Sequence, residues 1–139
     1  DQGSRDGMDL ALCVYDQKNG VIEYAGAFNP LYLVRNKKLH ETKADKIAVG
    51  SPENLDTEFS SHRINLQEND MLYIFSDGFA DQFGGPNNEK FKYKAFRELL
   101  LKNHALPLAR QQEALEEAFD NWRGPHPQVD DVLVIGVKV

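Results

Sequence analysis

Apolar residues fall in short runs separated by polar turn residues through the first 80 positions, a pattern typical of β-strands. Residues 71–75 are five consecutive apolar side chains followed by Ser76-Asp77-Gly78, which predicts a buried strand that delivers Asp77 to its end. Further strands are predicted over residues 8–15, 21–25, 31–35, 39–42 and 59–66. We expect the strands over 8–15, 21–25 and 31–35 to form a three-stranded meander, in which a turn at 16–20 closes the first hairpin.

Helical spacing appears only after residues 84–88, a breaker-rich loop that we expect to be mobile. Helices are predicted over 93–104 and 107–122, and the apolar residues of 129–139 predict a closing buried strand. Residues 1–7 contain no apolar side chain and are expected to be irregular. Strands, then two helices, then a last strand predict an α+β fold with helices packed on an antiparallel sheet.

Composition narrows the function classes. The 139 residues suffice for one domain, and a net charge of −6 argues against non-specific nucleic-acid binding. No apolar run approaches the ~20 residues that a membrane-spanning helix needs, so we expect no membrane contact from this segment. The single Cys13 excludes a disulfide within the chain and is interpreted as a small core residue, with a cytoplasmic location as the default.

Acidic residues follow the predicted strand over 71–75 and open the predicted closing strand. Asp77 follows the strand over 71–75, and Asp130 and Asp131 open the closing strand. If these strands lie side by side, the carboxylates meet in one cluster, where a hard cation such as Mg²⁺ or Mn²⁺ would offset their mutual repulsion. An ordinary Asp-Gly turn after a core strand is the alternative explanation of the first stretch.

Four stretches in order carry a resemblance to a known family. They are Asp6-Gly7-Met8-Asp9-Leu10-Ala11-Leu12-Cys13, Tyr24-Ala25-Gly26-Ala27-Phe28-Asn29-Pro30-Leu31-Tyr32, Ser76-Asp77-Gly78-Phe79-Ala80-Asp81 and Asp130-Asp131-Val132-Leu133-Val134. Together they resemble the bacterial SpoIIE-like group of PPM-type (type 2C) protein phosphatases, over essentially the whole chain. The resemblance implies a β-sandwich of two antiparallel sheets flanked by helices, with two Mn²⁺ or Mg²⁺ ions at one end.

Residue by residue, the resemblance implies that Asp77 and Asp130 are metal ligands. Asp131 occupies a neighbouring position that varies in the family and is a candidate ligand of lower rank. Asp81 matches a commonly acidic position and is expected to support the site or cap a helix. Asn29 is expected to be a turn residue.

One motif of the family has no counterpart here. The family carries an earlier Asp-x-Thr-Gly-His-Gly, whose Asp bridges both metals, and nothing like it occurs in this chain. We therefore interpret residues 1–139 as the C-terminal part of a single PPM domain, truncated at the N-terminus. On this interpretation the chain alone is expected to be inactive, to bind metal weakly, and to self-associate through uncovered sheet edges.

The leading hypothesis for the parent protein is metal-dependent hydrolysis of phosphoserine or phosphothreonine on a regulatory protein. An anti-sigma-factor antagonist is the substrate that the resemblance suggests, and an upstream sensor or regulatory domain in the same polypeptide is the expected partner. The alternative is a non-catalytic regulatory or binding module with a degenerate phosphatase fold. An acidic α+β domain with coincidental turns is the remaining option.

Overall fold

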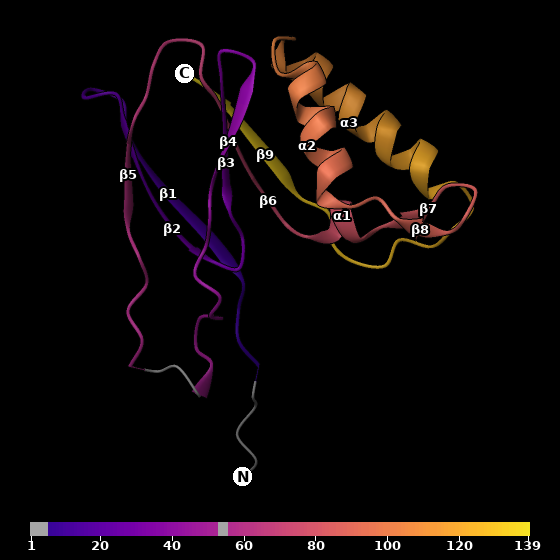
Figure 1. Cartoon of the computed structure of the whole chain (residues 1–139), viewed down its shortest axis with the longest axis horizontal. Coiled ribbons are helices and arrows are strands. Elements are labelled where there is room, and N and C mark those ends of the chain that lie inside the picture. The colour runs from indigo at the N-terminus through magenta and orange to yellow at the C-terminus, as the bar shows by residue number, and fades with distance from the viewer. Residues whose placement is uncertain (1–5, 53–55) are drawn as a thin grey trace.

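Two antiparallel sheets form the centre of the computed structural model, which describes residues 6–52 and 56–139 (Figure 1). The first sheet has the order β1-β2-β5 and contains β1 (Leu10–Asp16), β2 (Val21–Ala27) and β5 (His62–Asn65). The second has the order β4-β3-β6-β9 and contains β3 (Leu31–Arg35), β4 (Lys38–Thr42), β6 (Met71–Phe75) and β9 (Val134–Lys138). The other elements are α1 (Gly78–Asp81), β7 (Phe83–Gly84), β8 (Glu89–Lys90), α2 (Tyr93–Asn103) and α3 (Leu108–Arg123).

The inner faces of the two sheets share one core. Alternate residues of β3 and β6 point towards the first sheet, because successive side chains of a strand face opposite sides. The buried members of this core are Ile22, Tyr24, Leu31, Leu33 and Leu72. Ala11 and Cys13 of β1 pack against it, as expected for Cys13.

The remaining residues of β3 and β6 face the helices. Figure 1 shows α2 and α3 on the side of the second sheet that faces away from β1, β2 and β5. The buried members of this outer core are Tyr32, Val34, Met71, Tyr73, Phe75, Phe79, Phe96 and Leu100. The sandwich with flanking helices confirms the predicted fold class. In the part of the chain that the structure describes, no helix has both the length and the apolar character to cross a membrane.

The predicted three-stranded meander is wrong. β1 and β2 do form the expected hairpin, with Leu10 opposite Ala27 and Asp16 opposite Val21, but the free edge of β2 pairs with β5. β3 belongs to the other sheet, where it lies between β4 and β6. The chain changes sheets at Phe28, which has a φ of 61°, and the Tyr24 hydroxyl fixes this corner by donating to the carbonyl oxygen of Asn29, at 2.5 Å.

The remaining predicted elements are confirmed or differ only in extent. The helices over 93–104 and 107–122 are confirmed as α2 and α3, and the short strand over 39–42 is confirmed as β4. The strand expected over 59–66 contracts to β5, and the loop over 84–88 is the tip of the β7–β8 pair. Of the irregular stretch predicted at 1–7, residues 1–5 lie outside the described residues.

The closing strand is not buried as predicted. β9 begins only at Val134, and its side chains are exposed from Ile135 to Lys138. On β1 the larger apolar side chains, Leu12 and Val14, are 54% and 59% exposed, since Ala11 and Cys13 face the core instead. The apolar pattern thus indicated that both strands form but did not predict which of their side chains are covered.

Candidate functional site: an acidic pair beyond the β6–β9 strands

Asp77 stands where β6 gives way to α1. β6 ends at Phe75, and Asp77 is the residue that precedes the first turn of α1, so its carboxyl group is carried by a junction between two buried elements. The Gly78 that follows is required for space, and its φ is not positive, so the turn itself does not demand glycine. A Cβ on Gly78 would collide with the backbone carbonyl of Asp131.

Asp130 lies beside Asp77. β6 and β9 pair in antiparallel register from Met71–Lys138 to Phe75–Val134, so the residues after β6 and those before β9 meet at one end of the sheet. The pKa of Asp77 is raised by burial first, then by the negative charges of Asp130 and Asp81, and by a hydrogen bond between the Asp77 and Asp130 side chains. Two carboxylates this close repel unless one is protonated or a cation neutralises them.

The two other acidic candidates occupy different positions. Asp131 is exposed, and its contribution is through the backbone: its N–H donates to Asp130 Oδ1, at 2.7 Å, and its carbonyl accepts from Ser76 Oγ, at 2.8 Å. Asp81 ends α1, and its carboxylate lies 3.2 Å from the ammonium group of Lys90. The structure therefore brings Asp77 and Asp130 together and places Asp81 near enough to act on Asp77 by its charge.

Tyr93 is a site neighbour that the sequence did not reveal. Its pKa is raised to about 12, first by burial and then by the charges of Asp77 and Asp81, with smaller effects from Tyr32 and Asp9. Its ring also contacts the ring of Phe75, with centroids 6.4 Å apart. Tyr93 is the first residue of α2, where the sequence indicates a helix start and nothing about the acidic pair.

The two carboxyl groups are the type of ligand that a hard cation prefers, but they are few. Carboxylate oxygens are the ligands that Mg²⁺ and Mn²⁺ prefer, and the close pair of Asp77 and Asp130 fits that chemistry. Across residues 6–52 and 56–139, no group of three or more His, Cys, Asp or Glu side chains is placed to hold a metal ion. The pair fits as part of a ligand set.

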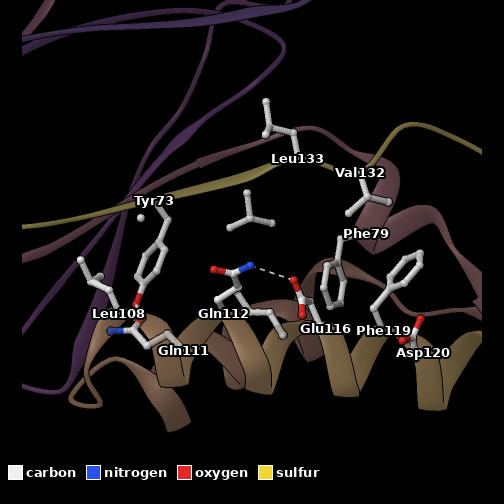
Figure 2. A pocket seen from close by; sticks show the side chains of 13 residues that line it. Tyr73, Phe79, Leu108, Gln111, Gln112, Glu116, Phe119, Asp120, Val132 and Leu133 are labelled. Carbon is white, nitrogen blue, oxygen red and sulfur yellow. Dashed lines mark hydrogen bonds between the residues drawn. The ribbon is translucent and has the colours of Figure 1, made fainter.

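A cavity of about 600 Å³ lies close to this site but does not include it. Figure 2 shows the cavity between α3 and β9, with Phe79 and Phe119 on one side and Tyr73 on the other. Gln112 and Glu116 line it and are joined by a hydrogen bond of 2.9 Å. Neither Asp77 nor Asp130 is among its lining residues, so the cavity is a feature of the helix-facing side of the sheet.

Solved structures share this fold. The SiaA-PP2C domain of Pseudomonas aeruginosa matches with a TM-score of 0.87 and 27% identity, over 94% of this chain and 51% of that chain. The PP2C phosphatase domain with a fragment of the regulatory domain of SpoIIE from Bacillus subtilis matches with a TM-score of 0.70 and 17% identity, over 94% and 37%. The catalytic domain of the serine/threonine protein phosphatase PstP, in complex with two manganese ions, matches with a TM-score of 0.62 and 16% identity, over 94% and 57%.

The chain therefore spans about half of the SiaA domain's length and less than two thirds of each of the other two chains. Comparison with curated proteins gives no significant match. The model of the stage II sporulation protein E (SpoIIE) family matches residues 2–139, which is nearly the whole sequence. On this match the chain belongs to the SpoIIE family, and its fold is that of the PP2C phosphatase domains.

Proposed function

We propose that the protein is a metal-dependent phosphatase that acts on phosphoserine or phosphothreonine, with Asp77 and Asp130 as metal ligands. The observation that carries this proposal is the close pair of carboxyls beyond the paired ends of β6 and β9, in a chain of a phosphatase family. Asp131 is proposed as a ligand of lower rank, because it is exposed beside the pair. On this proposal, residues 1–139 are the C-terminal part of one PPM domain.

The residues of this chain would hold and orient the ion. Asp77 and Asp130 offer carboxylate oxygens to the ion. Burial and mutual repulsion disfavour the ionised form of these carboxyls, and a bound Mn²⁺ or Mg²⁺ ion would offset that repulsion. When bound, such an ion lowers the pKa of a coordinated water and offsets charge on phosphoryl oxygens. Asp81, whose charge also acts on Asp77, is paired with Lys90 at 3.2 Å.

The proposed substrate is a phosphorylated regulatory protein, with an anti-sigma-factor antagonist as the candidate from the family resemblance. The proposed partner in the same polypeptide is an upstream sensor or regulatory domain. The SpoIIE structure, which contains a fragment of a regulatory domain, supports this arrangement. The net charge of −6 fits a protein substrate better than a nucleic acid.

Hydrolysis of a phosphothreonine peptide tests the proposal. In the full-length protein we expect turnover that depends on added Mn²⁺ and disappears with EDTA, and we expect Asp77→Asn to lower it by about 100-fold or more, whereas residues 1–139 alone should be inactive. Asp120→Asn is the matched control, because Asp120 is an exposed acid of α3 that lies 3.8 Å from Arg123. Turnover that resists EDTA, or that Asp77→Asn leaves intact, would contradict the mechanism. Absence of both turnover and Mn²⁺ binding would favour the non-catalytic module.

We also propose that this chain alone self-associates through β1. Among the described residues, β1 pairs along one edge only, with β2, apart from a single bridge at Leu10. No charged side chain interrupts β1 before Asp16, and natural edge strands use such charges to block pairing with other chains. Sedimentation should show a dimer or larger species that Leu12→Lys dissociates. A monomer at all concentrations would contradict this.

A further inference from the structure

The segment that carries Asp130 has no regular secondary structure of its own. α3 ends at Arg123 and β9 begins at Val134, and the ten residues between them, 124–133, form neither a helix nor a strand. Such a connection is held in one conformation only where contacts compensate the entropy of ordering it. The position of the Asp130 carboxyl group therefore depends on whatever fixes this segment.

Gln82 fixes the segment on the side that precedes Asp130. Its side chain is fully buried, at 0% exposure, and its Nε2 donates to the carbonyl oxygen of Pro127 at 2.9 Å. Its Oε1 accepts from the backbone N–H of Val129 at 3.4 Å. One side chain thus holds the backbone at two places, three residues and one residue before Asp130.

Ser76 fixes the segment on the side that follows Asp130. Its hydroxyl donates to the carbonyl oxygen of Asp131 at 2.8 Å and accepts from the N–H of Leu133 at 2.9 Å. The Ser76 N–H also donates to the Leu133 carbonyl oxygen, at 3.0 Å. The backbone is therefore held one and three residues after Asp130 as well.

We propose that Ser76 and Gln82 are positioning residues that hold Asp130 beside Asp77. Both come from the stretch that carries Asp77 itself, one residue before it and five residues after it. Their contacts reach the backbone on each side of Asp130, so they fix the two carboxylates relative to one another and not merely to the sheet. The proposal rests on the proposed function in so far as Asp130 is a metal ligand, since outer partners of a ligand commonly tune metal affinity.

A buried glutamine can also be no more than a satisfied polar group of the core. Gln111 on α3 is such a group: it is 4% exposed, accepts from the Tyr73 hydroxyl at 2.6 Å, and donates to the carbonyl oxygens of His104 and Leu106 at 3.0 and 2.9 Å. None of these partners lies in the segment of Asp130. The two glutamines therefore form a matched pair in residue type, burial and hydrogen bonding.

The experiment compares Gln82→Met with Gln111→Met, two substitutions of similar shape that remove the amide. The first readout is the Kd for Mn²⁺, measured by titration of the protein with the metal alone. The second is hydrogen exchange, without metal, at the Asp131 amide, which donates to Asp130 Oδ1 and not to Gln82. We expect Gln82→Met to raise the Kd about tenfold and to speed exchange at Asp131 about tenfold. Gln111→Met should leave both unchanged.

Unchanged exchange at Asp131 in folded Gln82→Met, or an equal effect of Gln111→Met, would overturn the proposal. Because exchange is read without metal, failure of wild-type protein to bind Mn²⁺ would count against the proposed function alone. If Gln82→Met does not fold, Ser76→Ala decides through the same two readouts. We expect Ser76→Ala to change both and Ser76→Thr, which keeps the hydroxyl, to restore them, and the opposite result would overturn the proposal.

Discussion

β6 and β9 are neighbouring strands of one sheet that differ in almost everything except their pairing. They are hydrogen-bonded along five residues and both are apolar in sequence. β6 has a strand on each edge and a packed layer on each face, so Leu72 is 3% exposed and Phe75 is 4% exposed. β9 has a neighbour on one edge only within the described residues, and its Val137 is 40% exposed although it lies directly opposite Leu72.

The burial of a strand is therefore set by its position in the sheets and not by its residue types. An apolar run indicates that a strand forms, but the number of its neighbours decides how much water it loses. The candidate site draws on both strands, since Asp77 follows the buried strand β6 and Asp130 lies in the segment before the exposed strand β9. The buried side is expected to fix the fold, whereas the exposed side depends on side-chain contacts for its position.

Shortening a side chain of the buried strand β6 should have the largest effect on the free energy of unfolding. Leu72→Ala removes a side chain from the core between the sheets and should lower the free energy of unfolding by about 2–5 kcal/mol, because the cavity cannot collapse between two packed layers. Urea denaturation followed by circular dichroism measures the change. A loss below about 1 kcal/mol would show that the inner core is not the main source of stability.

Removing the ion pair at the other end of β6 and β9 should have the second largest effect on stability. Asp70 is 1% exposed and accepts from Arg35 Nε and Nη2, at 2.9 and 2.6 Å, while its backbone carbonyl accepts from the Val139 N–H at 2.9 Å, where β9 ends. We expect Asp70→Asn to cost about 2 kcal/mol at pH 7. Glu23→Gln is the control, since the Glu23–Arg63 pair is exposed and should contribute at most about 0.5 kcal/mol.

The cost of Asp70→Asn should depend on pH. Burial alone would raise the pKa of Asp70, but hydrogen bonds from Arg35 and the Gln67 N–H, with the charge of Arg35, together lower it. A lowered folded-state pKa means that the stabilisation is complete above the ordinary value of 3.8 and is lost as the pH falls through the lowered folded-state value. Urea titrations at several pH values should show wild type and variant converging in acid. A constant difference would contradict the ion pair.

Shortening a side chain of the exposed strand β9 should have the smallest effect on the free energy of unfolding. Val137→Ala changes the residue opposite Leu72, and the lost stability should stay below about 1 kcal/mol because a large part of this side chain is already in water. The same urea titration measures it. If this loss equals that of Leu72→Ala, β9 is covered in solution, and self-association of the chain would be the first explanation to test by sedimentation.

The sequence predicted most of the helices and strands and the two aspartates of the candidate site. The run over 71–75 and the spacing of α2 and α3 were sufficient because local periodicity reports local structure. The partner of β2 was missed because pairing with β5 joins residues far apart in sequence, which no local pattern encodes. The exposure of β9 was missed for the same reason.

Within the site, the pairing of Asp77 with Asp130 followed from two strand ends that the sequence marks with acids. No local pattern indicates Tyr93 as a site neighbour, because its closeness to the acidic pair depends on how α2 packs against Phe75. Gln82 was missed as well, since a glutamine after a short turn has no signature of burial. Gly78 makes room for the Asp131 carbonyl, a contact between segments far apart in the chain that no local pattern predicts.

Paramagnetic broadening by Mn²⁺ tests whether Asp77 and Asp130 bind a metal ion. Small amounts of Mn²⁺ added to ¹⁵N-labelled protein should first remove the amide signals of residues 77–78 and 130–131, even if binding is weak. Asp77→Asn and Asp130→Asn should each abolish this pattern, and Glu116→Gln, which alters an exposed acid of α3, should leave it unchanged. Broadening that begins on α3, or that persists in both aspartate variants, would contradict a metal site built on Asp77 and Asp130.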